Sequence, residues 1–413
     1  MSRFDNVELG RPIEPFALNK AFILDTFSSK VNLGIGVYKT ANGTFWLLPC
    51  VRKAEQILAE DDSLEHEYLP VLGYNAFCKA ATNLLLGDNC KAIEEGRAFG
   101  VQALSGTGAL RIAAEFLRRI LNYNSVLVSL PTWENHHLLF KLAGFTNIKE
   151  YRYWNAKTRS LDLEGLLEDL EEAEENTVVV LHACAHNPTG CDPTQEQWKK
   201  IAEVMKRKKL FPLFDTAYLG FASGDVDADA WAVRYFVENE FELMCAQSFA
   251  KNFGLYNERV GNLAIILNNV KNVETVKSQM TLIIRGMYSN PPAHGAKIVA
   301  LILNNLELKK DWHKCIEKMS GRIKSMRIEL KNRLDKLGTP GDWHHITSQI
   351  GMFSYTGLTQ RQVEHLVNKY HIYLLKSGRI NMCGLNLTNI DYVANSIDET
   401  VKAIPVESVD SII

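Results

Sequence analysis

A single lysine, Lys251, stands between small and apolar residues in CAQSFAKNFGLYNERVG, residues 245–261. The residues before it alternate between apolar and small types over the length of a strand, and KNFG is typical of a turn. Unpaired lysines are rarely buried, so Lys251 fits the exposed end of a strand. It also fits a reactive amine, because desolvation at the end of a buried strand lowers the pKa of a lysine and lets it attack a carbonyl group. This segment alone leaves both interpretations open.

A glycine-rich turn precedes a predicted helix in LSGTGALR, residues 104–111. The hydroxyls of Ser105 and Thr107 and the backbone N–H groups around Gly106 would point toward one spot. The positive end of the helix dipole favours an anion such as phosphate there. A turn of this kind also occurs where it only begins a helix, so phosphate binding is one of two interpretations.

Polar residues follow two further predicted strands. Asp215 ends the strand in FPLFDTAYLGFASG, and Tyr218 comes three residues later. A carboxylate in this place can cap the next turn, or it can pair with a ring nitrogen of a bound cofactor. In HACAHNPTG the end of a strand meets an Asn-Pro turn at Asn187.

Two more fragments contain residues suited to ligand binding. PTWENHH places Trp133 and His136 after a strand, and GRINMCG places Arg379 after a Ser-Gly turn. Trp133 also fits an ordinary core position, and Arg379 also fits a surface ion pair. Neither fragment is specific by itself.

A metal site is the alternative for one histidine-rich segment. His182, Cys184 and His186 would share one face of a regular strand, as zinc ligands can. No second cluster of Cys or His residues supports such a site, and we expect no metal.

Taken together, these residues meet the demands of one cofactor. A cofactor that acts as an electron sink needs an amine that binds its aldehyde, an acid beside its ring nitrogen and an anion site for its phosphate. It also needs an aromatic side chain against its ring and a cation that binds the substrate carboxylate. In that order, the chain offers Lys251, Asp215, Ser105 to Thr107 with Arg259, Trp133, and Arg379. Pyridoxal phosphate has these demands, and we predict that the chain binds it.

The elements that must position these residues alternate in type from about residue 100 onward. Strands are predicted at 124–131, 177–184, 210–215, 241–249 and 262–267, with helices such as 105–121 and 194–209 between them. This alternation favours an α/β fold with a mostly parallel sheet and helices on both faces. Ligands of such sheets bind at the carboxyl ends of the strands. After about residue 310, long helices and then short strands predict a second domain, which we expect to include the N-terminal segment.

Composition and charge narrow the classes of function. The chain has 413 residues, 46% of them apolar, enough for one large and one smaller domain. Lys and Arg number 46 against 48 Asp and Glu, which gives no electrostatic reason to expect nucleic acid or an anionic membrane as a partner. The acidic run 169–177 and the basic run 199–209 are predicted to lie on solvated helix faces.

The expected location is the cytoplasm. The N-terminal residues lack the pattern of a signal or transit peptide, and no apolar run is long enough to span a bilayer. The eight cysteines are scattered without CxxC pairs, as expected of reduced thiols. Small molecules and other proteins remain as partners.

Several longer segments are highly specific as a set. They are EYLPVLGY, SGTGALR, PTWENH, HACAHNPTG, FDTAYLGFASGD, QSFAKNFGLYNERVGN, SNPPAHGAKIVA, DWHHITSQIGMFSYTGL and SGRINMCGL. In these segments the chain resembles the aspartate aminotransferase family of fold-type I pyridoxal-phosphate enzymes, and its animal cytosolic form most of all, from about residue 16 to the C-terminus. The resemblance implies a seven-stranded sheet in a large cofactor-binding domain, residues 46–318. A small α+β domain would combine residues 1–45 with 319–413.

The resemblance also implies the role of each residue near the cofactor ring. Lys251 would bind the cofactor covalently and then move a proton between the substrate Cα and the cofactor. Asp215 would hold the proton on the ring nitrogen, with His136 behind it. Tyr218 and Asn187 would hydrogen-bond the phenolic oxygen of the cofactor.

The other implied contacts concern phosphate and substrate in a homodimer with shared active sites. Phosphate would be bound by Ser105, Gly106, Thr107, Ser248, Arg259 and, from the neighbouring subunit, Tyr68. Substrate would be bound by Gly36, Trp133, Asn187, Arg379 and, from the neighbouring subunit, Arg285. Arg379 would receive the α-carboxylate and Arg285 the distal one, because the planar guanidinium fork binds carboxylates through two hydrogen bonds.

The chain departs from the family pattern at a few positions. Ala250 stands where the family usually has serine, which would remove one hydroxyl from the phosphate site. Lys376 stands where proline is usual, and Lys39 replaces an arginine. The segment DTFSSK, residues 25–30, lacks the usual Asp-Pro loop. No catalytic position is missing.

We therefore expect transamination between L-aspartate and 2-oxoglutarate, giving oxaloacetate and L-glutamate. Another reaction of the same cofactor on an acidic amino acid, such as racemisation or decarboxylation, is the first alternative. The second is a catalytically weak homologue kept for binding or assembly, for which Ala250 and Lys376 are the only support.

Overall fold

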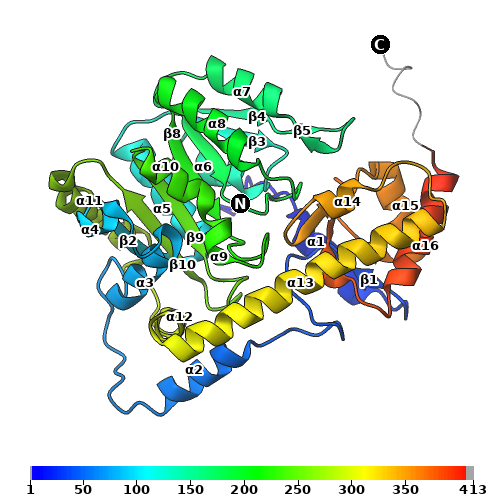
Figure 1. Cartoon of the computed structure of the whole chain (residues 1–413), viewed down its shortest axis with the longest axis horizontal. Coiled ribbons are helices and arrows are strands. Elements are labelled where there is room, and N and C mark those ends of the chain that lie inside the picture. Colours follow the sequence, from blue (N-terminus) through cyan, green and yellow to red (C-terminus); the bar gives the residue numbers. More distant parts are fainter. Residues whose placement is uncertain (1, 406–413) are drawn as a thin grey trace.

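The computed structural model of the chain describes residues 2–405. A seven-stranded sheet lies at the centre of the larger part of the molecule, between helices (Figure 1). In spatial order its strands are β2 (Ala98–Leu104), β10 (Val260–Ile266), β9 (Leu243–Ser248), β8 (Phe211–Thr216), β7 (Val178–His182), β3 (Ser125–Leu130) and β4 (Asn147–Arg152). All run in one direction except β10, which is antiparallel to both of its neighbours. The predicted seven-stranded, mostly parallel sheet is confirmed.

Helices cover both faces of this sheet. One face packs against α5 (Ser105–Arg119), α6 (Asn135–Ala143) and α11 (Val273–Tyr288). The other packs against α7 (Leu163–Glu172), α8 (Gln195–Arg207) and α10 (Trp231–Glu238). In β7, Val178 and Val180 are buried in the first layer, and Val179 and Leu181 in the second. Successive residues of a strand face opposite sides, so a strand covered on both faces needs apolar residues throughout.

The direction of β10 determines what lies at the carboxyl edge of the sheet. Strands β2, β3, β4, β7, β8 and β9 end at this edge, and β10 begins there. Val260, the first residue of β10, pairs with Leu104, the last residue of β2. The residues outside this pair also meet, because the N–H of Ser105 donates to the carbonyl of Arg259 at 3.1 Å. Residues that precede β10 therefore lie at the same edge of the sheet as residues that follow the parallel strands.

The two ends of the chain come together in a smaller part of the molecule, on the right of Figure 1. Its strand pairs are β1 (Val31–Asn32) with β12 (Ile372–Tyr373), parallel, and β11 (Phe353–Tyr355) with β13 (Arg379–Asn381), antiparallel. Its helices are α1 (Glu14–Leu24), α14 (His345–Ser348), α15 (Gln360–Tyr370) and α16 (Ile390–Ala403). The long helix α13 (Leu306–Lys336) runs from the larger part into the smaller one (Figure 1). The expected boundary after residue 318 falls within this helix, and the division into two domains stays a prediction.

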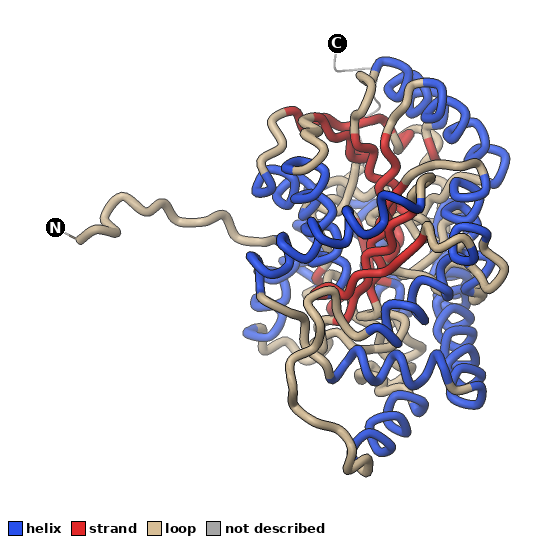
Figure 2. Tube along the Cα trace, turned by 90° about the vertical axis from the view of Figure 1, so that its left-hand side faces the viewer, coloured by secondary structure: helices blue, strands red, loops and turns tan. Residues whose placement is uncertain are grey.

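Shorter elements complete the described part of the chain. They are α2 (Pro49–Ala59), α3 (Asn75–Leu86), α4 (Lys91–Glu94), α9 (Val226–Asp229), α12 (His294–Asn304), η1 (Val270–Asn272), η2 (Met382–Gly384), β5 (Trp154–Asn155) and β6 (Ser160–Leu161). Before α1, the N-terminal residues extend away from the body (Figure 2). No helix between residues 2 and 405 has both the length and the apolar character needed to cross a membrane.

One sequence prediction about helices is wrong in part. The acidic run 169–177 was expected on a helix, but α7 ends at Glu172 and the rest of the run leads into β7. Asn176 has a φ of 64°, which is incompatible with a continuing right-handed helix. Its N–H donates to the carbonyl of Lys209 at 3.1 Å, just before β8. The backbone is already extended at Ala173, with a ψ of 146°, so the helix stops there and the rest of the run leads toward the pairing of β7 with β8.

Arg327, on α13, is buried and has no carboxylate partner among residues 2–405. Its Nη1 donates to the carbonyl of Ile346 at 2.9 Å, and its Nη2 donates to the carbonyls of Gly351, at 2.9 Å, and Phe353. Burial lowers the pKa of Arg327 to about 10, so the guanidinium is still charged at neutral pH. Arg327 thus joins the long helix to the segment that leads into β11.

We expect Arg327→Met to lower the free energy of unfolding by about 3 kcal/mol, because three buried carbonyls would lose their donor at roughly 1 kcal/mol each. Urea unfolding followed by circular dichroism measures the change. Arg361→Met, on the exposed side of α15, is the matched control and should change stability by no more than about 0.5 kcal/mol. Equal losses in the two variants would contradict the assigned role.

Candidate active site

Lys251 lies in the turn directly after β9, at the carboxyl edge of the sheet. Its Nζ is 5.0 Å from the centre of the Tyr218 ring. Burial lowers the pKa of Lys251 to about 8, an effect that the charge of Asp215 opposes in part. A substantial fraction of the amine is therefore neutral slightly above pH 7. This environment favours the reactive amine over the solvated surface lysine.

Asp215 lies near the end of β8, buried beside His136. Its Oδ2 is 3.0 Å from His136 Nε2, and His136 Nδ1 is 2.8 Å from the Thr132 hydroxyl. If the hydroxyl donates to Nδ1, the histidine carries its proton on Nε2 and donates it to Asp215. Burial alone would raise the pKa of Asp215, but the hydrogen bond from His136 and the charge of Lys251 help to lower it below its usual value. An ionised carboxylate of this kind can hold a protonated ring nitrogen.

Further histidines lie behind Asp215. The rings of His182 and His186 are 4.2 Å apart, and the possible ligand atoms of His136, His182 and Asp215 lie within 4.8 Å of one another. Burial lowers the pKa of His182 to about 3, so this side chain is neutral. The expected alternation of His182, Cys184 and His186 along one strand face is wrong, because β7 ends at His182 and the chain then bends.

The start of α5 has the composition of an anion site. Ser105 follows β2 directly, and its Oγ is 2.9 Å from Ser248 Oγ, at the end of β9. No side chain caps this helix end, so the N–H groups of the first turn that follow Ser105 remain available. Gly106 leaves room beside them, since an added Cβ would lie 3.1 Å from Ser248 Cβ. Thr107 follows in the same turn and is half-buried.

Strand β10 passes very close to this helix start. At Gly261 an added Cβ would lie 2.4 Å from the carbonyl carbon of Ser105, so the approach requires glycine. Arg259 precedes the strand with an exposed side chain, whose Nη1 donates to the carbonyl of Tyr256 at 2.8 Å. Since the backbone of Arg259 meets Ser105, an exposed cation lies at the same edge of the sheet as the start of α5.

Arg379, the first residue of β13, is only 6% exposed. Its Nη1 donates to Asn187 Oδ1 at 3.1 Å and its Nη2 to the carbonyl of Gly34 at 2.7 Å, while its Nε lacks a partner in the described chain. The guanidinium carbon lies 4.0 Å from the centre of the Phe353 ring, and Gly36 faces the same ring. Burial lowers the pKa of Arg379 to about 10, so it is charged at neutral pH. A buried cation with an unused donor suits a carboxylate ligand.

Two aromatic residues border the lysine and the aspartate. Tyr218 is buried, with its ring edge-on to Phe353 at 5.7 Å between centroids. Burial raises the pKa of Tyr218, so its hydroxyl keeps its proton. Trp133 is half-buried and stands edge-on to His136 at 5.4 Å. The expected stacking of Trp133 on a cofactor stays a prediction.

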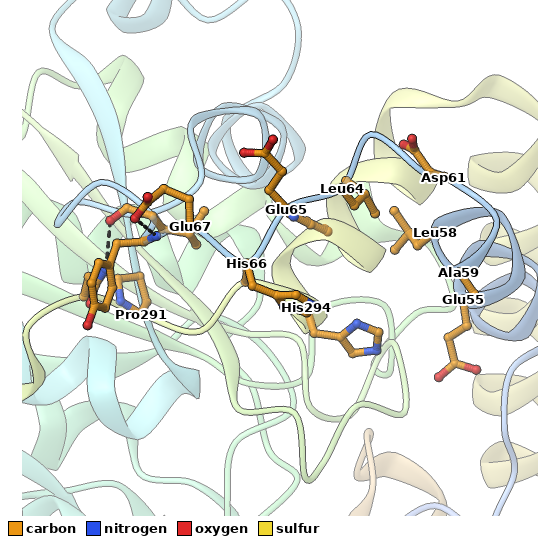
Figure 3. Close-up of a pocket in the computed structure, with 15 residues that line it drawn as sticks. Glu55, Leu58, Ala59, Asp61, Leu64, Glu65, His66, Glu67, Pro291 and His294 are labelled. Atoms are coloured by element: carbon orange, nitrogen blue, oxygen red, sulfur yellow. Dashed lines mark hydrogen bonds between the residues drawn. The ribbon is translucent and has the colours of Figure 1, made fainter.

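Tyr68 and Arg285 lie apart from this cluster in the single chain. Tyr68 is 83% exposed and lines a cavity of about 540 Å³ between α2 and α12 (Figure 3). Arg285 is exposed near the end of α11 and donates to the Ser289 hydroxyl. The amide of Asn290 donates to the carbonyl of Leu69 at 2.9 Å, which holds the two segments side by side. Their expected roles across a subunit boundary stay predictions.

Sequence reasoning did not identify Phe353 as part of the site. Its ring lies against the guanidinium of Arg379, contacts the ring of Tyr218 and faces Gly36. A phenylalanine in a short apolar strand has the pattern of ordinary core, so only its place in the family segment DWHHITSQIGMFSYTGL pointed to it.

Comparisons with known proteins agree with this geometry. A family model described as aminotransferase class I and II matches residues 28–397. A protein of Caenorhabditis elegans named cytoplasmic aspartate aminotransferase is 56% identical over 404 residues, 98% of this chain and 99% of that protein. The structure of aspartate aminotransferase from Saccharomyces cerevisiae cytoplasm is 45% identical, with a TM-score of 0.95, and the alignment covers 97% of this chain and 99% of that one.

A bacterial structure is similar to the same extent. The aromatic-amino-acid aminotransferase of Burkholderia pseudomallei, solved covalently bound to pyridoxal phosphate, is 44% identical with a TM-score of 0.94, over 97% of this chain and 100% of that one. Its sheet architecture and that of the yeast enzyme are shared across nearly the whole chain. The chain therefore belongs to the class I and II aminotransferase family.

Proposed function

We propose that the chain is a pyridoxal-phosphate-dependent aspartate aminotransferase, which transfers the amino group of L-aspartate to 2-oxoglutarate and gives oxaloacetate and L-glutamate. The observation that carries this proposal is the meeting, in one site, of the Lys251 amine, the ionised Asp215 and the buried Arg379. The worm and yeast relatives are named for the same activity.

The residues present fit the cofactor. The paired hydroxyls of Ser105 and Ser248 and the free N–H groups of α5 suit a phosphate, and Gly106 leaves room for it. Asp215 suits a protonated pyridine nitrogen, and Lys251 suits an aldehyde. Ala250, where the family pattern has serine, would weaken this site by about one neutral hydrogen bond, roughly 1 kcal/mol.

The chain's own residues would hold and move protons around the cofactor. Pyridoxal phosphate, when bound, supplies an aldehyde for the amino group and a ring that accepts the electrons released at the substrate Cα. Lys251 would take the proton from the substrate Cα with its neutral amine and deliver it to the cofactor. Asp215, oriented by His136, would keep the proton on the ring nitrogen. Tyr218 and Asn187 would donate hydrogen bonds to the phenolic oxygen.

Substrate recognition would rest on carboxylates. Arg379 would receive the α-carboxylate that aspartate and 2-oxoglutarate share, with its free Nε as one donor and Asn187 holding its other end. Trp133 and Gly36 would border the bound substrate. Phe353 would hold the guanidinium of Arg379 in place through the contact with its ring.

A homodimer with shared active sites would complete the site. Arg285 would bind the distal carboxylate and Tyr68 the phosphate of the neighbouring subunit. Support comes from their common exposed edge, where Asn290 and Leu69 join the two segments. Residues 46–318 would form the large domain of each subunit, and residues 1–45 with 319–413 the small one.

We assign the protein to the cytoplasm, the location in the names of its worm and yeast relatives. Racemisation or decarboxylation of an acidic amino acid would use the same lysine and carboxylate sites. The products formed from L-aspartate therefore decide between these reactions and transamination.

The first prediction concerns the Lys251 amine. In cofactor-free protein, acylation of Lys251 should follow its neutral fraction, with a midpoint near the pKa of about 8. Below this pH the amine is protonated and unreactive. In Asp215→Asn the midpoint should move to lower pH, because the carboxylate charge raises the pKa of Lys251. Mass spectrometry of the labelled peptide measures both curves, and a midpoint that does not move would contradict the contact.

The second prediction tests the reaction. Lys251→Ala should still bind pyridoxal phosphate but lose at least about a thousandfold in kcat, since it lacks both the nucleophile and the proton carrier. Oxaloacetate release from L-aspartate and 2-oxoglutarate gives the rate, and the absorbance spectrum reports retained cofactor. Lys157→Ala, at an exposed position, is the control. A wild-type protein that binds cofactor but forms no oxaloacetate would rule out the proposed activity.

The third prediction tests the shared site. Lys251→Ala and Arg285→Ala homodimers should each be inactive with aspartate. In a mixed dimer one site carries both changes and the other carries neither. Co-refolding equal amounts places half of the dimers in the mixed form with one intact site of two, so activity should recover to about a quarter of wild type. Lack of recovery in demonstrated mixed dimers would place the whole site within one chain.

A further inference from the structure

A hydrogen bond joins the start of α1 to the turn before Arg379. The backbone N–H of Lys376 donates to Glu14 Oε1 at 2.7 Å. The family pattern has proline at position 376, and proline has no N–H to donate. The bond therefore exists only because this chain departs from the pattern.

The turn that contains Lys376 leads directly into Arg379. Gly378 closes it, with its N–H donating to the carbonyl of Leu375 at 2.8 Å and its own carbonyl accepting from the Thr356 hydroxyl at 2.8 Å. Proline at 376 would fix the φ of that residue near about −65°. Lysine leaves this dihedral free, and the hydrogen bonds within the turn involve Leu375, Gly378 and Arg379 but not Lys376.

Glu14 is well placed to constrain this turn, because α1 is anchored at its other end. Asp25, which follows α1, accepts hydrogen bonds from the Tyr373 hydroxyl at 2.7 Å and from His371 Nδ1 at 2.6 Å. Helix α1 thus contacts the segment 371–376 at both ends.

We propose that Glu14 is a positioning residue for Arg379, and that its hydrogen bond to the Lys376 N–H replaces the rigidity of the missing proline. The turn held in this way fixes the start of β13, and with it the guanidinium that meets the α-carboxylate of both substrates. This inference rests on the role of Arg379 in the proposed function.

The test begins with Glu14→Ala. Loss of the acceptor should raise KM for aspartate and for 2-oxoglutarate by about fivefold and leave kcat within about twofold, since a mobile Arg379 weakens ground state and transition state alike. Hydrogen–deuterium exchange of the peptide that covers residues 374–378 should become faster. Glu317→Ala, an exposed carboxylate on α13, should change neither measurement.

Position 376 supplies the decisive comparison. In the Lys376→Pro background the N–H is absent and the ring fixes the turn, so Glu14→Ala should have no effect on KM. In the Lys376→Ala background the N–H remains, and Glu14→Ala should again cost about fivefold. An equal effect of Glu14→Ala in both backgrounds would overturn the inference, as would faster exchange without a change in KM.

The role of Glu14 can be tested even if the proposed transamination is not observed. If the wild-type protein binds cofactor but does not transaminate, binding of succinate measured by calorimetry replaces KM in the same set of variants. Weaker succinate binding in Glu14→Ala with Lys376, but not with Lys376→Pro, would still support the positioning role. Unchanged succinate binding in all of these variants would contradict the positioning role of Glu14.

Discussion

One constraint governs the whole site: six parallel strands end at a single edge of the sheet, and one antiparallel strand begins there. The backbone hydrogen bonds between strands stop at each strand end. Polar side chains that follow these ends can therefore face a ligand. Helices cover both faces of the sheet, so polar residues from distant parts of the sequence meet at this edge.

Two buried arginines show how the same side chain serves different ends. Arg327 gives its terminal nitrogens to three backbone carbonyls and so joins α13 to the segment before β11. Arg379 uses one carbonyl and one amide oxygen and keeps Nε free. Phe353 connects them, since its carbonyl accepts from Arg327 and its ring lies under Arg379. Arg327 thus holds the strand whose phenylalanine ring lies against Arg379, and in both arginines Nε has no partner among residues 2–405.

The sequence was most informative where a local pattern has a local cause. The run VVVL in β7 is apolar at each position because both faces are covered. Asp215 lies near the end of one strand and Lys251 follows another, and both strand ends are visible as turns. Phe353 was missed because its function comes from a contact with Arg379, which is not encoded in its own segment. The early end of α7 was also missed, because the acidic run continues past Ala173, where the backbone is already extended, toward the pairing of β7 with β8. For Tyr68 and Arg285, roles across a subunit boundary came from resemblance alone.

The backbone at Ser105 shows a conflict between stability and chemistry. Its φ of 62° lies in the left-handed region, which glycine adopts freely and serine only at a cost of about 1 kcal/mol. Selection for stability alone would favour glycine there. The hydroxyl, paired with Ser248, is what serine adds in return. At position 105 the chain thus gives up folding free energy for a polar group. A variant with glycine there is expected to be more stable and less active.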